Sequence, residues 1–492
     1  MKLQDVIAGT DIHGAQATSL SLNVTGVSCD TRTLQPGELF FAIDSRFAAP
    51  AFERGACAVV LQAGVGRPAE LPESHGLRSA NPRVAMALCA ANFFGRPAHR
   101  LTMLGVTGTN GKTTTSLLAE SMLRAAGESV GVIGTIGYGF AGKTLAAPNT
   151  TPGSVPLQRL LADMRAEGVT SVVMEVSSHA LDQERAAGIP FTSAAFTNLT
   201  RDHLDYHGDM ACYFAAKRRL FTELCAGVCS LNLDDPHGQA LHAELVREGR
   251  VTFGFSTHSE QADLFVTDLV ADLDGLRGML HTPKGSARFD SKLVGRHNVE
   301  NLLAAVGLVL GAGFELEELI DGIAALSVVP GRLERVPSQH CAVFVDYAHT
   351  DDALTHVLAA LRPLTTGRLI CVFGCGGDRD HGKRPLMGEA VARGADVAIV
   401  TNDNPRSESP EAIAAAIEEG LKRGGLSLDR YAVELDRRCA IERALGLAGA
   451  QDVVLIAGKG HETYQLIGDR TFEFDDRAEV LAALERLKGE IG

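Results

Sequence analysis

The sequence contains no tryptophan, and aromatic residues make up only 5% of its 492 residues. Small aliphatic side chains must therefore fill most of its interior, as part of a hydrophobic fraction of 45%. The N-terminal residues lack both a basic start and a long apolar run. We therefore expect neither a secretory signal nor insertion into a membrane, and a location in the cytoplasm.

Positive charge is also scarce. Lys and Arg total 46 against 60 Asp and Glu, which gives a formal net charge of −14. This balance opposes non-specific binding to nucleic acid, so no nucleic-acid partner is expected. Anionic substrates would instead depend on local Arg, Lys and metal ions. We expect the protein to act as a monomer.

The ten cysteines are scattered along the chain. The closest pairs, Cys225/Cys229 and Cys371/Cys375, lack the two-residue spacing that is typical of zinc and redox sites. Reduced thiols that serve only in packing are therefore expected.

Local patterns predict an α/β protein of three domains. Residues 1–98 mix short apolar runs with turn residues, which predicts a small N-terminal α/β domain. Residues 99–330 repeat the strand, glycine turn and helix pattern of a doubly wound nucleotide-binding domain, with antiparallel strands at 263–289. Residues 331–492 contain four buried-type runs, which predict a second, Rossmann-like parallel sheet. These runs are 342–346, 369–373, 397–401 and 453–456.

A glycine-rich segment, with glycines at 105, 108 and 111 and Lys-Thr directly after the last, follows an apolar run and opens a predicted helix at 105–114. Glycines let backbone N–H groups turn toward phosphate oxygens, Lys112 adds positive charge, and Thr113 offers a hydroxyl to Mg²⁺. The motif predicts a nucleoside triphosphate site and by itself leaves a motor, a switch and a ligase open. The predicted nucleotide contacts are Gly108, Thr109, Asn110, Gly111, Lys112, Thr113 and Thr114.

Two further segments carry polar side chains where a doubly wound sheet gathers its functional groups. Glu175 ends a predicted strand and is placed to bind a metal ion. The loop 198–208 contains two carboxylates, several nitrogen and hydroxyl groups and an Arg. Within it His203 is a candidate magnesium ligand, with a plain hydrogen-bonded histidine as the alternative.

Taken together, these motifs resemble those of the Mur ligases. The resemblance rests on the segments 108–114, 198–208, 330–334 and 346–350, whose order and spacing match the family. Within the family the chain is most similar to the MurE group, which adds the third residue to UDP-N-acetylmuramoyl-L-Ala-D-Glu. The resemblance implies ATP as co-substrate, Mg²⁺ as cofactor and amide formation through an acyl phosphate, in peptidoglycan synthesis.

The resemblance also implies roles for residues that carry no signal alone. It implies adenine and ribose contacts from Asn298, Asn301, Arg332 and Asp346. Helix capping by Asn298 and a surface charge at Arg332 are the ordinary alternatives.

By sequence alone, Lys217 is one more solvated helix cation. The matching family lysine carries CO₂ as a carbamate, which implies a metal ligand beside Glu175 and His203. That reaction requires a neutral amine, and the adjacent Arg218 and Arg219 are expected to disfavour protonation of Lys217.

Contacts to the UDP-N-acetylmuramoyl-dipeptide are implied in two regions. Hydroxyl, amide and guanidinium groups suit an anionic sugar peptide. Those of the central domain are Asn149, Thr150, Thr151, Ser177, Gln183 and Arg185. In the N-terminal domain Cys29 and Thr31 stand where the family more usually has Asp-Ser-Arg. A turn at Thr151 and an exposed helix surface at Gln183 are the alternatives.

The sequence Asp-Asn-Pro-Arg at 403–406 resembles the version associated with meso-diaminopimelate. Arg406 would bind the distal carboxylate, while Asp403, Asn404 and Glu462 would receive the distal ammonium. The full implied set is Arg379, Asp403, Asn404, Pro405, Arg406, Gly458 and Glu462. A sister ligase that adds L-lysine, D-Ala-D-Ala or glutamate on folate, and a non-catalytic P-loop protein, are the alternatives.

Overall fold

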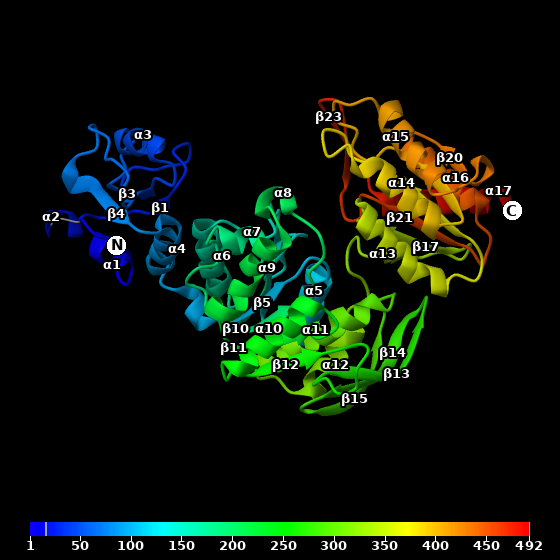
Figure 1. Ribbon diagram of the computed structural model, residues 1–492, viewed down its shortest axis with the longest axis horizontal. Coiled ribbons are helices and arrows are strands. Elements are labelled where there is room, and N and C mark those ends of the chain that lie inside the picture. Colours follow the sequence, from blue (N-terminus) through cyan, green and yellow to red (C-terminus); the bar gives the residue numbers. More distant parts are fainter. Residues whose placement is uncertain (15–16, 492) are drawn as a thin grey trace. The chain divides into compact units, whose positions relative to one another are not determined.

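The computed structural model describes residues 1–14 and 17–491. The chain divides into two compact units. The first unit comprises Met1–Thr267, Met279–Arg288 and Glu300–Ile323, and the second comprises Asp268–Gly278, Phe289–Val299 and Ala324–Gly492. Each unit combines helices with sheets, which confirms the predicted α/β class (Figure 1).

A four-stranded parallel sheet in the order β1-β2-β3-β4 occupies the start of the first unit. Its strands are β1 (Val27–Ser28), β2 (Leu39–Phe41), β3 (Ala58–Gln62) and β4 (Gly76–Ser79). The neighbouring helices are α1 (Leu3–Val6), α2 (Ala17–Leu20), α3 (Ala48–Glu53) and α4 (Pro82–Phe93). Asn81 begins α4 by accepting a hydrogen bond from the backbone N–H of Val84, and Pro82 suits the first turn.

An eight-stranded sheet in the order β12-β11-β10-β5-β9-β6-β7-β8 forms the rest of the first unit. Its strands are β5 (Thr102–Thr107), β6 (Val130–Ile133), β7 (Tyr138–Phe140), β8 (Lys143–Leu145), β9 (Ser171–Glu175), β10 (Phe191–Phe196), β11 (Cys225–Asn232) and β12 (Thr252–Phe255). The pairs β6/β7 and β7/β8 are antiparallel, and the strands from β12 to β6 run parallel. The carboxyl ends of β5, β9 and β10 therefore meet at one edge of the sheet.

Helices connect these strands, as a parallel sheet requires. They are α5 (Lys112–Ala125), α6 (Ser154–Ala166), α7 (Ser178–Asp182), α8 (Leu204–His207), α9 (Met210–Arg219) and α10 (Pro236–Arg247). A separate three-stranded sheet contains β13 (Phe265–Asp272), β14 (Gly275–Thr282) and β15 (Gly285–Ser291). Two-residue connections force neighbouring strands to be antiparallel, which confirms the prediction for 263–289. Helices α11 (His297–Gly311) and α12 (Leu316–Ala325) follow.

The second unit contains a six-stranded sheet in the order β16-β17-β21-β18-β19-β20. Its strands are β16 (Glu334–Val336), β17 (Ala342–Asp346), β18 (Leu369–Phe373), β19 (Val397–Val400), β20 (Tyr431–Val433) and β21 (Val453–Ala457), followed by the hairpin β22 (Tyr464–Ile467) and β23 (Arg470–Glu473). Among the described strand pairs of the six-stranded sheet, β16/β17 is antiparallel and the others are parallel. Strands β18 and β21 are buried along their whole length. All four runs predicted as strands are confirmed.

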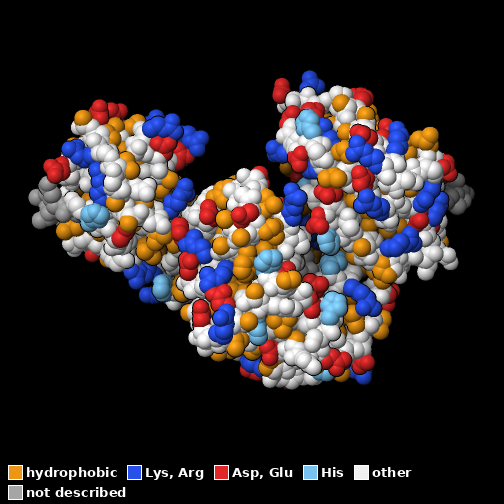
Figure 2. All heavy atoms as spheres, in the orientation of Figure 1, with side chains coloured by type: hydrophobic (Ala, Val, Ile, Leu, Met, Phe, Trp, Pro, Cys, Tyr) orange, Lys and Arg blue, Asp and Glu red, His pale blue; other side chains and the backbone are white. Residues whose placement is uncertain are grey.

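Five helices cover this sheet: α13 (Asp351–Leu361), α14 (Lys383–Gly394), α15 (Pro410–Arg423), α16 (Arg437–Leu447) and α17 (Asp476–Ile491). Positive and negative side chains are interspersed over the face of the molecule in Figure 2. None of the helices in the described ranges combines the length and apolarity needed to span a bilayer.

Two glycines in helices of the second unit are expected to respond in opposite ways to substitution by alanine. A Cβ atom at Gly420 in α15 would lie 1.9 Å from the carbonyl oxygen of Pro385, whereas one at Gly446 in α16 would meet no atom within 4 Å. Gly420→Ala should therefore lower the free energy of unfolding by roughly 1–3 kcal/mol. Gly446→Ala should leave it unchanged or raise it by up to about 1 kcal/mol. Urea unfolding measures the free energy of unfolding of both variants. Equal changes in the two variants would contradict the close packing of α15 on α14.

Candidate active site

The phosphate-binding loop joins β5 to α5. Gly108 has φ +152° and Gly111 has φ +85°, in the range that favours glycine. A Cβ atom at Gly108 would lie 1.9 Å from Thr197 Oγ1, and one at Gly111 would lie 2.2 Å from Asn301 Oδ1. Neighbouring side chains thus close against both glycines. The loop leads into the N-terminus of α5, and the N-terminus of a helix suits phosphate oxygens.

Two lysine side chains meet at one carbonyl of this loop. Lys112 Nζ donates to the carbonyl oxygens of Gly108 at 2.9 Å and Thr109 at 2.8 Å. Lys217 Nζ, from α9, donates to the same Gly108 oxygen at 2.8 Å. The structure therefore brings Lys217 to the predicted nucleotide site.

The polar loop at 198–208 packs against the phosphate-binding loop. Asn198 accepts the backbone N–H of Asn110 on Oδ1 and that of Thr109 on its carbonyl oxygen, both at 2.9 Å. The N–H of Thr200 donates to Thr109 Oγ1 at 3.0 Å. These contacts hold the backbone of the phosphate-binding loop in place. Thr113 and Thr114 lie buried in the first turn of α5.

Glu175 ends β9 beside Val106 of β5. Its side chain is 2% exposed, and its two oxygens accept the N–H and the hydroxyl of Thr135, each at 3.1 Å. Thr135 Oγ1 lies 3.0 Å from Thr150 Oγ1. The carboxylate thus sits one strand from the phosphate-binding loop and next to a predicted substrate contact.

Lys217 is only 1% exposed. Burial lowers the pKa of its amine well below the usual range and the charge of Lys112 lowers it further, while Asp202 acts in the opposite direction. The expectation that Arg218 and Arg219 would provide this effect was wrong. Arg218 pairs with Glu244, and Arg219 pairs with Glu184 and Glu223. The pKa of Lys217 is thus lowered by a different cause from the one expected.

His203 belongs to a group of aromatic side chains near α7 and α8. Its ring centroid lies 4.8 Å from that of His179 and 6.1 Å from that of Tyr213, and its Nε2 lies 3.4 Å from Asp202 Oδ2. Within the described ranges, no three His, Cys, Asp or Glu side chains gather as a metal-binding group. A metal ion at Glu175 and His203 would therefore need further ligands. Magnesium sites commonly take theirs from substrate phosphates and water.

A chain of hydrogen bonds joins most of the predicted sugar-peptide contacts. Thr151 Oγ1 donates to the carbonyl oxygen of Glu175 at 2.8 Å and accepts the N–H of Ser177 at 3.0 Å. Arg185 donates to the carbonyl oxygen of Thr151 at 2.9 Å and to Gln183 Oε1 at 2.7 Å. These residues therefore form one polar cluster around the end of β9. Asn149 lies two residues before Thr151 in the chain, and its carbonyl oxygen accepts the hydroxyl of Tyr138 at 2.6 Å.

Cys29 and Thr31 follow β1 and therefore belong to a different sheet from the other predicted contacts. Cys29 is exposed, and the carbonyl oxygen of Thr31 accepts Arg54 Nη1 at 2.6 Å. Between them, Asp30 forms an exposed ion pair with Arg32. The structure places Cys29 and Thr31 at the surface, next to the four-stranded sheet.

In the second unit, Asp346 ends β17 and lies close to Arg332. Its carboxylate is 8% exposed and accepts the backbone N–H groups of Leu333 at 2.6 Å and Ala348 at 2.8 Å. Burial raises the pKa of Asp346, and the Arg332 charge partly offsets this. Arg332 also stacks over Tyr347 at 5.2 Å. A separate bond joins Asn298 Nδ2 to the carbonyl oxygen of Val294 at 2.8 Å.

The predicted acceptor residues that follow β19 and β21 converge. Asn404 Nδ2 donates to Glu462 Oε2 at 3.1 Å, and a Cβ atom at Gly458 would lie 3.7 Å from the Asp403 carboxyl carbon. Sequence reasoning missed Lys459, whose Nζ lies 3.4 Å from Asp403 Oδ1 and 3.9 Å from Glu462 Oε2. In the sequence, the signal was that Gly458 and Gly460 flank this lysine.

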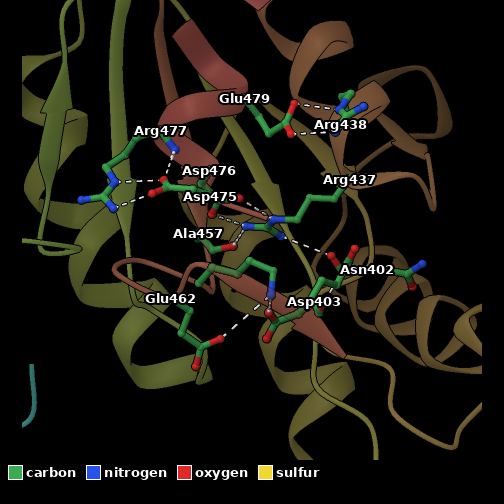
Figure 3. A network of polar contacts seen from close by, with 12 residues as sticks. Asn402, Asp403, Arg437, Arg438, Ala457, Glu462, Asp475, Asp476, Arg477 and Glu479 are labelled. Atoms are coloured by element: carbon green, nitrogen blue, oxygen red, sulfur yellow. Dashed lines mark hydrogen bonds and ion pairs between the residues drawn. The ribbon is translucent and has the colours of Figure 1, made fainter. Parts of the chain in front are cut away.

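Figure 3 shows a second buried pair that the sequence analysis missed. Arg437 bonds Asp476 through two contacts of 2.7 Å, with both side chains 0% exposed, and donates to the carbonyl oxygen of Ala457 at 3.0 Å. This pair ties α16 and α17 to the end of β21. The pair therefore helps to hold the strand end that leads into the predicted acceptor residue Gly458.

The two predicted acceptor arginines differ in their surroundings. Arg406 has φ +52°, and its Nη1 donates to the carbonyl oxygen of Gly377 at 2.8 Å. The preceding Pro405 is buried. Arg379 is exposed and reaches only the carbonyl oxygen of Asp378, at 3.5 Å. Arg406 is therefore the better fixed of the two.

Comparison with known proteins identifies the family. Residues 106–309 match the Mur ligase middle domain, and residues 331–460 match the Mur ligase glutamate ligase domain. A UDP-N-acetylmuramoyl-L-alanyl-D-glutamate–2,6-diaminopimelate ligase from Geobacter sulfurreducens is 45% identical over 98% of both chains. The chain belongs to the Mur ligase family. A ligase of the same name from Solibacter usitatus is 46% identical over 99% of both chains.

Solved structures agree with this Mur ligase assignment. A structure of a UDP-N-acetylmuramoyl-L-alanyl-D-glutamate–2,6-diaminopimelate ligase is 35% identical and covers 99% of both chains with a TM-score of 0.74. MurF from Acinetobacter baumannii, at 18% identity and a TM-score of 0.63, shares the fold. The predicted three-part α/β Mur ligase architecture is therefore confirmed.

The crowding at Gly108 generates a prediction for this Mur ligase. Gly108→Ala should weaken ATP binding at least about tenfold, because the added methyl group displaces Thr197 or the loop backbone. Gly127→Ala is a matched control, since Gly127 also has positive φ but meets no atom within 4 Å. The control should lose some stability and keep its ATP affinity. Calorimetric titration with ATP would contradict the prediction if both variants bound equally well.

Proposed function

We propose that this Mur ligase joins meso-diaminopimelate to the D-glutamate carboxylate of UDP-N-acetylmuramoyl-L-alanyl-D-glutamate in peptidoglycan synthesis. The observation that carries the acceptor assignment is the cluster of Asp403, Glu462 and Arg406. Two carboxylates and a guanidinium match the ammonium and carboxylate at the distal end of diaminopimelate. L-Lysine has the ammonium but lacks that carboxylate, which would leave Arg406 without an anion.

ATP supplies the phosphoryl group in this proposal. The glutamate carboxylate attacks the γ-phosphorus, which gives an acyl phosphate and ADP, and the amine of the acceptor then displaces phosphate. Lys112 and the N–H groups at the start of α5 face the growing negative charge. Asn301, against Gly111, and Arg332 and Asp346 of the second unit are the proposed contacts to the nucleoside, together with Asn298.

Magnesium fits the donors that the chain offers. Thr113 supplies a hydroxyl, Glu175 a buried carboxylate and His203 an imidazole, and oxygen-rich sites of few protein ligands are typical for Mg²⁺. The ion would neutralise charge on the phosphate oxygens. The cluster from Thr150 to Arg185 is the proposed site for the sugar peptide, with Cys29 and Thr31 toward its uridine end.

A carbamate on Lys217 is part of the proposal. The neutral amine attacks CO₂, a C–N bond forms as one C–O π bond opens, one proton leaves to solvent, and the neutral side chain becomes an anion that can bind metal. The buried, low-pKa amine supports this assignment. We also propose domains at 1–98, 99–330 and 331–492, action as a monomer, and a location in the cytoplasm, where ATP is available.

Phosphate release that depends on the acceptor tests the proposed function. Purified enzyme with ATP, Mg²⁺ and the UDP-sugar dipeptide should release phosphate on addition of meso-diaminopimelate. L-Lysine, D-Ala-D-Ala and a folate substrate with glutamate serve as competing acceptors. Preference for one of these would identify a sister ligase, and no release with any acceptor would support a non-catalytic nucleotide-binding protein.

Arg406→Ala should lose kcat/KM for diaminopimelate by about a hundredfold, because a charge-assisted pair in a closed site contributes roughly 1.5–3 kcal/mol. The ratio of kcat/KM for diaminopimelate to kcat/KM for L-lysine should also fall. The variant no longer carries the guanidinium that bound lysine would leave unpaired. Arg423→Ala, at an exposed arginine in the last turn of α15, is the control. Undiminished selectivity in Arg406→Ala would overturn the assignment of Arg406.

Lys217→Ala should lose nearly all turnover, because it removes the group that becomes the carbamate. High bicarbonate should not restore activity, whereas short-chain carboxylic acids should restore part of it by supplying the missing anion. Steady-state kinetics with and without acetate or propionate measure this effect. Near-normal turnover of Lys217→Ala would show that no carbamate is needed.

A further inference from the structure

Lys459 lies in the loop between β21 and β22, and its side chain is 0% exposed. Its Nζ donates to Tyr464 O at 2.7 Å and to Asn404 Oδ1 at 3.0 Å. The same nitrogen lies 3.4 Å from Asp403 Oδ1 and 3.9 Å from Glu462 Oε2. Lys459 Nζ thus makes two hydrogen bonds, and two carboxylates lie at ion-pair distance from it; Asp403 Oδ1 accepts no hydrogen bond from the described residues.

The cation offsets one of these two carboxylates. Arg437 is already committed to Asp476 through a closed bidentate pair, so it adds no net charge. Burial lowers the pKa of Lys459, and the Asp403 and Glu462 carboxylates act in the opposite direction. With the amine protonated, Asp403, Glu462 and Lys459 together carry a net charge of −1. One carboxylate charge is left over for an ammonium from outside the protein. Arg406 stands beside the group as the candidate for an incoming carboxylate.

Lys459 also fixes the Asn404 side chain. Asn404 Oδ1 accepts Lys459 Nζ and the backbone N–H of Leu466, both at 3.0 Å, so both acceptor positions of that oxygen are in use. The amide nitrogen must then point the other way, toward Glu462 Oε2 at 3.1 Å. Asn404 consequently orients Glu462 and has no oxygen left for the ammonium of a substrate.

We propose that Lys459 is a positioning residue of the acceptor site, which sets its charge to match a single ammonium and orients Glu462 through Asn404. The inference rests on the proposed function, because it takes this cluster as the diaminopimelate site. It also narrows that function: the distal ammonium binds Asp403 and Glu462, and Asn404 acts only through Glu462.

The charges around Glu462 determine the expected pH dependence. Burial raises the pKa of Glu462 and Asp403 raises it further, while Asn404, Lys459 and Arg406 lower it. The remaining titratable groups recorded around Asp403, Lys459 and Glu462 are Arg437, Asp476, Tyr464, Tyr347, His349 and Cys375. Loss of the Lys459 charge should therefore raise the pKa of Glu462. A protonated Glu462 cannot pair with an ammonium, so acceptor binding should fail at a higher pH than in the wild type.

Lys459→Met and Lys459→Gln separate charge from hydrogen bonding. Both should raise KM for diaminopimelate about tenfold or more, with KM for ATP and for the UDP-sugar dipeptide nearly unchanged. Both should move the acidic limb of kcat/KM for diaminopimelate upward by about one pH unit. The double variant Lys459→Met/Glu462→Gln should lose this limb altogether, since the side chain at 462 no longer titrates. Lys422→Met, at an exposed lysine of α15, should change neither quantity.

A purely structural role for Lys459 would lower stability or all kinetic constants together and leave the pH limb in place, which would overturn the proposal. If the variants do not fold, ¹³Cε-lysine NMR of the wild-type protein, assigned with Lys459→Arg, decides the matter. A Lys459 signal that titrates below neutral pH would show that the amine carries no charge to offset. Wild-type enzyme that ignores diaminopimelate would instead defeat the proposed function itself.

Discussion

Burying a positive charge costs several kcal/mol unless a partner offsets it, and the architecture of the candidate site depends on how three buried basic side chains meet this constraint. Arg437 bonds Asp476 in a closed pair that links α16, α17 and β21. Lys459 faces two carboxylates and the carbonyl oxygen of Tyr464. Lys217 bonds the neutral carbonyl of Gly108 and lies near the like charge of Lys112. The three side chains thus have different partners: a carboxylate in a bidentate pair, two carboxylates with a carbonyl oxygen, and a carbonyl oxygen alone.

The parallel sheets decide where these groups can act. In the first unit, the phosphate-binding loop, Glu175 and Thr197 all follow or end the adjacent strands β5, β9 and β10. In the second unit, Asp346, Asp403 and Gly458 stand at the ends of β17, β19 and β21. Backbone pairing stops at the carboxyl edge, so polar side chains there can be satisfied by one another or by a ligand. Each unit therefore has one polar edge, supported by strands that are almost wholly buried.

Close backbone approach gives the first of these edges its rigidity. Thr197 and Asn301 occupy the positions that side chains on Gly108 and Gly111 would need, and Asn198 holds the backbone of Thr109 and Asn110. The loop at 198–208 therefore does two things at once. It fixes the phosphate-binding loop, and it carries His203 toward the same region. This explains why so many polar residues are concentrated in one short connection.

The sequence by itself determined the α/β class, the four strands β17, β18, β19 and β21 of the second unit, the phosphate-binding loop and the Mur ligase resemblance, because each depends on contiguous residues with a fixed local pattern. It did not determine what surrounds each side chain. Lys217 meets Gly108, 109 residues away along the chain, and Lys459 meets Asn404, 55 residues away. The expected role of Arg218 and Arg219 failed for the same reason. Consecutive residues of a helix point about 100° apart, so these arginines turn to Glu244 and Glu184 while Lys217 turns inward. Only the tertiary structure decides which charges share a buried space, and that sets the surroundings of each lysine.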